Sequence, residues 1–124
     1  MSVRGGTPTS RRERRAKASA IIAARSVKIY QGTRDIDGLR VTVDGRRLPE
    51  HYALKQFTKW GFEWTYEGAS PRQLALAILY DHLGDKDRAI ALCEPFMRKV
   101  IADLDNDWTL TEAQIERAIT EMNS

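Results

Sequence analysis

Two segments that alternate apolar and polar side chains predict a small antiparallel β-meander. One covers residues 27–33 and the other residues 39–43, and a repeat of two is the pattern of a half-buried strand. The dipeptides Asp37-Gly38 and Asp44-Gly45 each predict a hairpin turn, because tight turns between strands require a positive φ. Residues 46–48 can return as a short third strand. The residues that share one face are Val27, Ile29 and Gln31 in the first segment and Leu39, Val41 and Val43 in the second.

The next stretch is rich in aromatic residues. Residues 53–60 have the length of one or two helical turns, and residues 62–66 alternate aromatic with polar side chains. As a strand, the second segment has three aromatic rings on one face: Phe62, Trp64 and Tyr66. We expect these rings to cover the meander and to receive the first helix. Trp60 and Tyr66, near the ends of the aromatic stretch, are expected to be partly exposed.

A helix is predicted from about residue 70 to residue 83. Ser70 is expected to cap it, Pro71 suits the first helical position, and Gln73 completes a capping box with Ser70. Gly84 is the expected stop, because a left-handed residue commonly ends a helix. The apolar positions on one face of this helix are Leu74, Ile78 and Leu79.

A second helix is predicted to start after the cap Asp85 and to run to about Ala102. Pro95 lies within it and is expected to kink it, since proline removes a backbone donor and clashes with the preceding turn. The apolar face of this helix includes Cys93.

A third helix follows near the C-terminus. Its capping box is either Thr109 with Glu112 or Thr111 with Gln114. These elements together predict an α+β fold, in which a meander of two or three strands packs on a C-terminal three-helix unit. Residues 27–122 are expected to form this single domain, and residues 1–26 a basic arm that is disordered or helical.

Composition places the chain among soluble globular proteins. Hydrophobic residues make up 42% and charged residues 30% of the 124 residues, and no apolar run approaches the roughly 20 residues of a membrane helix. Cys93 is the single cysteine and therefore cannot form an internal disulfide, which agrees with a reducing compartment. We expect a cytoplasmic protein that does not bind membranes.

The positive charge is concentrated in the N-terminal arm. Residues 1–26 carry seven basic groups and one acidic group, whereas the remaining chain has 13 basic and 16 acidic residues. Ser10 and Glu13 could form a capping box for a helix in this arm. A dense cationic cluster of this kind suits phosphates or an acidic partner: Arg11, Arg12, Arg14, Arg15 and Lys17.

The residues that usually carry catalysis do not form a recognisable set. Cys93 is expected to be a buried structural thiol, His82 to interact with the end of its helix, and His51 to be solvent-exposed. The two histidines have no spacing typical of metal ligands, and no phosphate-binding glycine loop is present. Glu63 and Glu67 could form a carboxylate pair, but nothing locates a substrate. We therefore expect no catalytic residue, no metal and no cofactor.

Several short motifs resemble an uncharacterised family of small prokaryotic and phage domains of unknown function. They are a glycine-bounded aromatic segment at residues 61–68, a Pro-x-Gln-Leu-Ala-Leu-Ala helix at residues 71–77, Leu-Gly-Asp at residues 83–85 and Trp-x-Leu-Thr at residues 108–111. The resemblance covers about residues 27–119. It implies the fold and its extent, and it carries no activity. The arm lies outside it, and Pro95 departs from it.

Three functions are open on the sequence alone. The first is a non-enzymatic protein-interaction module with an unknown protein partner, whose contact surface would include Trp60, Glu63 and Tyr66. Phage or mobile-element inhibitors of host defence are a subset of this class. The second is a nucleic-acid-binding accessory protein that uses residues 1–25. The third is an enzyme of a type that the sequence does not reveal.

Overall fold

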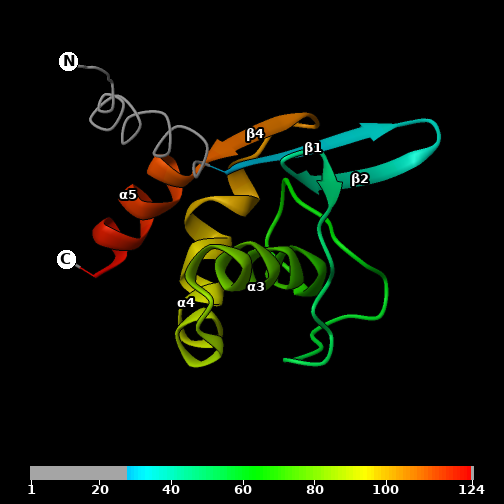
Figure 1. The fold of residues 1–124 in the computed structure, drawn as a ribbon. Coiled ribbons are helices and arrows are strands. Elements are labelled where there is room, and N and C mark those ends of the chain that lie inside the picture. The colour runs from blue at the N-terminus through cyan, green and yellow to red at the C-terminus, as the bar shows by residue number, and fades with distance from the viewer. Residues whose placement is uncertain (1–27, 124) are drawn as a thin grey trace, which may run out of the picture.

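The fold is an antiparallel sheet packed on α-helices, as predicted. The computed structural model describes residues 28–123 (Figure 1), and within them it contains a four-stranded sheet in the order β3-β2-β1-β4 and three α-helices. The predictions for residues 1–26, including the Ser10 and Glu13 capping box, lie outside this range. The strands are β1 (Ile29–Asp35), β2 (Gly38–Val43), β3 (Arg46–Arg47) and β4 (Trp108–Thr111).

Both predicted hairpins form, although the first turn lies one residue before the predicted Asp37-Gly38 dipeptide. Asp35 pairs with Gly38, so the first turn consists of the two residues between them. Val43 pairs with Arg46 across the second turn, where Asp44 has a φ of 50° and Gly45 a φ of 83°. Two consecutive positive φ angles match the right-handed twist of paired strands. Figure 1 shows the far end of the β1–β2 hairpin extending beyond the helices.

Strand β4 is an element that the sequence pattern did not predict. It pairs antiparallel with β1, with Leu110 opposite Tyr30 and Trp108 opposite Gly32. The Trp108 ring lies over Gly32, where an added Cβ would come within 2.3 Å of the indole. The buried face of β1 is the one with Tyr30 and Gly32, while Ile29 and Gln31 are exposed.

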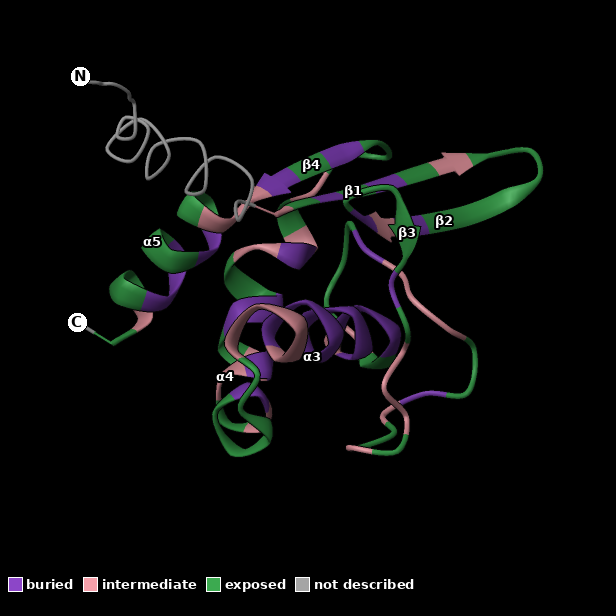
Figure 2. Ribbon diagram, viewed as in Figure 1, coloured by how far each residue is buried: buried purple, intermediate pink, exposed green. Residues whose placement is uncertain are grey.

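Helix α3 (Ala69–Leu83) is the centre of the core. It is buried on nearly all sides from Ser70 to Leu79 (Figure 2), rather than along a single apolar face. The prediction that Ser70 caps the helix is wrong, because the cap residue is Gly68, and the Ser70 hydroxyl instead donates to Thr58 Oγ1 at 3.0 Å. Gly84 ends the helix with a φ of 69°, as predicted.

Helix α4 (Lys86–Lys99) packs against α3. Asp85 caps it, as expected, by accepting from Arg88 N at 3.1 Å. Pro95 lies on its exposed side, and the helix continues past it to Lys99. The chain then forms a short 3-10 helix, η2 (Ile101–Asp103), so the predicted helix to Ala102 is slightly too long.

Helix α5 (Glu112–Met122) follows β4 directly. Thr111 is both the last residue of β4 and the cap of α5. The capping box uses Thr111 and Gln114, which decides between the two boxes that the sequence left open.

The aromatic segment at residues 62–66 is not a strand, which corrects the prediction. Thr65 has a φ of 81°, so the chain turns there and the alternation is interrupted. Trp64 is buried, where it packs edge to face on Trp108 with ring centroids 5.7 Å apart, whereas Tyr66 is exposed. Residues 53–60 form no helix either; a turn at residues 52–54 takes its place.

Candidate functional site

One buried side chain makes three of the hydrogen bonds that hold a long irregular segment between β3 and α3, residues 48–68. Gln73 of α3 is fully buried. Its amide nitrogen donates to Glu50 O at 2.8 Å and to Lys55 O at 3.0 Å, and its amide oxygen accepts from Phe57 N at 2.8 Å. These three bonds fix a loop that has no backbone ladder of its own. Gln73, predicted as half of a capping box, therefore binds the loop instead.

Two further contacts fix the backbone on both sides of Trp60. Trp60 N donates to Thr58 Oγ1 at 3.1 Å, and Gly61 N donates to the Tyr52 hydroxyl at 3.0 Å. Gly61 has a φ of 83°, which a residue with a side chain rarely adopts. The Trp60 side chain is nevertheless 81% exposed. A rigid backbone therefore presents a large aromatic ring to solvent.

An open groove lies between this loop and strand β2. Its volume is about 750 Å³. Leu39, Arg40 and Val41 of β2 line one part of it, and Trp60 and Phe62 line another. We call this space the Trp60 groove; its lining also includes Arg47 and Glu50.

The structure does not bring the predicted interaction residues into one surface. Trp60 lines the groove, but Glu63 is bound by Arg34 of β1 through two contacts of 2.8 and 3.2 Å. The Arg34 guanidinium also lies 5.0 Å from the centroid of the Trp64 ring, so Glu63 belongs to an internal contact. Tyr66 is 48% exposed and lies beside Gly68, outside the groove lining.

The predicted phosphate-binding residues Arg11, Arg12, Arg14, Arg15 and Lys17 lie outside the described residues. Across the solvent-facing side of the described sheet, the strand residues are aliphatic, polar or charged and none is aromatic. That face therefore has no ring on which a base could stack. Within residues 28–123, no helix has the length and apolar character needed to cross a membrane.

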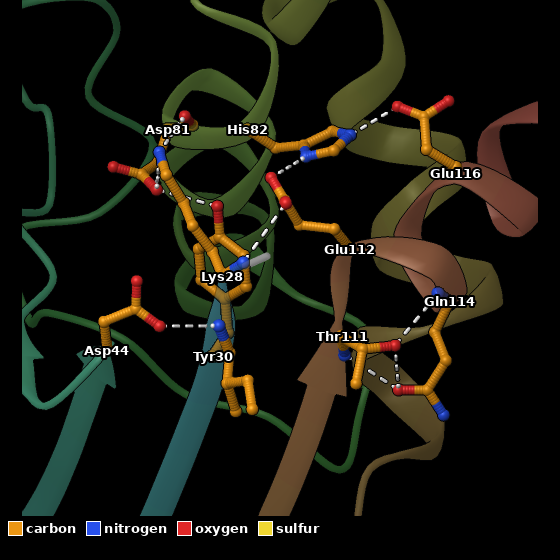
Figure 3. A network of polar contacts seen from close by, with 10 residues as sticks. Lys28, Tyr30, Asp44, Asp81, His82, Thr111, Glu112, Gln114 and Glu116 are labelled. Atoms are coloured by element: carbon orange, nitrogen blue, oxygen red, sulfur yellow. Dashed lines mark hydrogen bonds and ion pairs between the residues drawn. The ribbon is translucent and has the colours of Figure 1, made fainter. Parts of the chain in front are cut away.

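A second cluster of polar side chains joins the end of α3 to the sheet (Figure 3). The Tyr30 hydroxyl donates to Asp81 Oδ2 at 2.7 Å, and the Lys28 ammonium lies 3.2 Å from the same oxygen. Burial, and then the hydrogen bond to Asp81, raise the pKa of Tyr30 far above its usual value. Tyr30 therefore stays protonated and acts as a donor at any physiological pH.

His82 extends this cluster to α5. Its Nδ1 lies 3.0 Å from Glu112 Oε2, and its Nε2 contacts Glu116. The two carboxylates are on opposite sides of the ring, so they cannot bind one metal ion together with the imidazole, and no metal-binding group of three such residues occurs within the described chain. Within residues 28–123 both ring nitrogens of His82 contact carboxylates, and neither contacts a hydroxyl or thiol that the histidine could activate. Its contacts join α3, β1 and α5.

The remaining histidine and the cysteine are held by packing. His51 is half-buried, which corrects the expectation of an exposed side chain, and its ring meets Tyr80 edge to face at 4.9 Å. Burial lowers the pKa of His51. Cys93 is buried on α4, as expected, and burial raises the pKa of its thiol. Neither residue lines the Trp60 groove.

The chain belongs to a family of unknown function, DUF6166, whose family model matches residues 30–121. The match confirms the resemblance to a family of unknown function. No curated protein and no solved structure matches the chain. The family description assigns no activity.

Proposed function

We propose that this protein is a non-enzymatic binding module that recognises another protein through the Trp60 groove. The observation that carries the proposal is the 81% exposure of Trp60 on a loop whose backbone is fixed from both sides. Tryptophan is among the residues that contribute most binding energy at protein interfaces. A backbone that is already held in place also loses little conformational entropy on binding.

The chemistry of the groove supports binding rather than catalysis. Its lining combines aliphatic and aromatic side chains with Arg40, Arg47 and Glu50, and it includes no histidine or cysteine. The side chains whose pKa values burial shifts, Tyr30, His51 and Cys93, lie elsewhere. Catalytic sites usually gather such groups in one cleft. The single cysteine supports action in a reducing compartment such as the cytoplasm.

The test is a nuclease-treated pull-down from a lysate of the native organism with three baits. The baits are the wild-type chain, Trp60→Ala and Tyr66→Ala, the last being a matched control because Tyr66 is an exposed aromatic outside the groove. We expect one protein to be retained by the wild type and the control and lost with Trp60→Ala. Equal retention by all three baits would refute a role for the groove. Since Trp60 is exposed, its substitution should change the free energy of unfolding by less than about 0.5 kcal/mol.

A second function, nucleic-acid binding through the arm, rests on the distribution of charge. Residues 1–26 have a net charge of +6, and the rest of the chain has a net charge of −3. Contact by such an arm would be electrostatic and sensitive to salt. Deleting residues 1–25 should then abolish retention on DNA or RNA and remove most of its salt dependence. Unchanged retention after the deletion would exclude this function.

A further inference from the structure

We infer that the partner binds as an extended acidic segment that adds a strand to the outer edge of β2. The inference rests on the proposed function and specifies its binding mode. Strand addition of this kind gives affinity through backbone hydrogen bonds and specificity through side-chain pockets at alternate positions.

Two hydrogen bonds show which backbone groups of β2 face its outer edge. Asp44 N donates to Ile29 O of β1 at 2.9 Å. Along an antiparallel pair, the residues whose backbone groups bond to the partner strand alternate with residues whose groups point away from it. Thr42 and Arg40, two and four residues before Asp44, therefore also bond to β1. On the other side, Leu48 N donates to Val41 O at 3.0 Å. Val41 and Leu39 therefore point their backbone groups away from β1.

This outer edge is only partly covered. Strand β3 pairs with Thr42 and Val43 alone, and Leu48 reaches Val41. No backbone group within residues 28–123 bonds the N–H or C=O of Leu39 across this edge. An edge strand with open backbone groups is a template for a further strand. Neither a proline nor a bulge protects the edge between Gly38 and Val41.

The Trp60 groove runs beside this same edge. An added strand would lie about 4.8 Å from β2, in the space that Trp60 and Phe62 border from the loop. Leu39 is 38% exposed and lies on the same face of β2 as Val41. Every second side chain of the added strand would meet these apolar groups, and the others would point to the face with Arg40.

The charge around the groove determines the chemistry of the partner. Of the charged side chains that line the groove, Arg47 is paired with Glu50 at 2.6 Å, whereas no ion pair within residues 28–123 engages Arg40. The Lys59 ammonium lies 5.7 Å from the centroid of the Trp60 ring. This excess of cations favours a segment with Asp or Glu at the alternate positions. A second copy of the chain would instead bring a second Arg40 to this edge and no acidic group to pair with it.

The probe is a displayed library of random 12-residue peptides, selected on the full-length chain. We expect the recovered peptides to alternate apolar and acidic residues and to lose binding to Trp60→Ala. Leu39→Pro should weaken a recovered peptide about tenfold, because it removes an outward N–H. Proline is tolerated where the lost N–H faces away from the sheet. Leu39→Ala is the matched control for the lost side chain, since it keeps the N–H, and it should weaken the peptide less than Leu39→Pro does.

A synthetic version of the same peptide provides a test that does not depend on a folded variant. Methylating the peptide nitrogen that would face Leu39, whose backbone groups are open at this edge, should weaken binding to the wild-type chain at least tenfold, and methylating the alternate nitrogens should have little effect. Arg40→Glu should weaken the acidic peptide and favour a lysine-bearing counterpart.

The outcomes separate the inference from the proposed function. Peptides that need Trp60 but tolerate Leu39→Pro and methylation of each of these peptide nitrogens would overturn strand addition and leave the proposed function standing. Recovery of basic peptides would overturn the inference that the partner is acidic. Self-association of the chain that Leu39→Pro abolishes would overturn it as well. If no recovered peptide depends on Trp60, both the inference and the proposed function fail.

Discussion

Replacing Gln73 with leucine should destabilise the fold, although leucine is apolar and of similar size. Gln73 is fully buried in α3 and makes three hydrogen bonds to the backbone of one loop, at 2.8, 2.8 and 3.0 Å. The substitution removes all three bonds at once. It leaves Phe57 N, Glu50 O and Lys55 O without their partner at the surface of a buried helix.

The expected loss follows from the number of bonds. A hydrogen bond inside a protein contributes roughly 1 kcal/mol net, so three bonds give about 3 kcal/mol. The partners in the loop are only half-buried or exposed, and water can satisfy some of them, which keeps the cost near this figure. For a domain of this size, about 3 kcal/mol corresponds to a fall in Tm of roughly 12–24 °C.

The assay is urea denaturation followed by circular dichroism, with Gln56→Leu as the matched control. Gln56 lies in the same loop and is exposed, so its substitution should cost less than about 0.5 kcal/mol. Hydrogen exchange at the Phe57 amide gives a local readout, because this N–H is bound directly by Gln73. A loss below about 1 kcal/mol for Gln73→Leu, with unchanged protection of Phe57, would refute the view that this side chain holds the loop.

Three further predictions test other parts of the structure. Gly32→Ala should destabilise the fold by about 1–3 kcal/mol, because its Cβ would come within 2.3 Å of the Trp108 indole; denaturation at or near the wild-type urea concentration would contradict this. The free energy of unfolding should fall as pH rises above about 10, the ordinary pKa of tyrosine. The pKa of Tyr30 is raised in the folded chain, so above this pH only the unfolded chain releases the Tyr30 proton. Tyr30→Phe should flatten that fall in urea titrations, and an equal slope in both proteins would exclude Tyr30 as its cause. Cys93 should react with a thiol reagent far more slowly in the native chain than in urea, since burial raises its pKa and blocks access; equal rates would contradict its burial.

The features that the sequence predicted correctly depend on local physics. The positive φ angles at Asp44 and Gly45 are a requirement of a tight hairpin, whatever surrounds it. The caps at Asp85 and Thr111 likewise depend on a side chain and an N–H a few residues apart. Such signals can be read from a few neighbouring residues.

The features that were missed depend on contacts between distant segments. Strand β4 is four residues long, and it becomes a strand because β1, far away in sequence, offers it an edge. Residues 62–66 alternate like a strand, but Thr65 turns the chain so that Trp64 can reach Trp108. Ser70 and Gln73 have the spacing of a capping box, yet both side chains bind the preceding loop. Spacing alone does not distinguish a cap from a tertiary contact.

The candidate site was predictable in one respect only. The exposure of Trp60 was expected from its position near the end of the aromatic stretch, and the structure confirms it. The groove itself could not be foreseen, because it needs residues 48–62 to lie beside the outer edge of β2. Glu63 was expected on the same surface, but Arg34 of β1 binds it instead.

Gln73 also connects the stability of the fold to the proposed binding surface. An apolar residue would fill the same volume in the core without the cost of burying an amide. A buried glutamine has an advantage at this position because the loop that carries Trp60 has no ladder of its own to hold it. Gln73→Leu should therefore weaken both the fold and the binding of peptides to the groove, whereas Trp60→Ala should weaken binding alone. If Gln73→Leu lowers the free energy of unfolding and leaves the affinity for peptides unchanged, peptide binding does not depend on the hydrogen bonds between Gln73 and the loop.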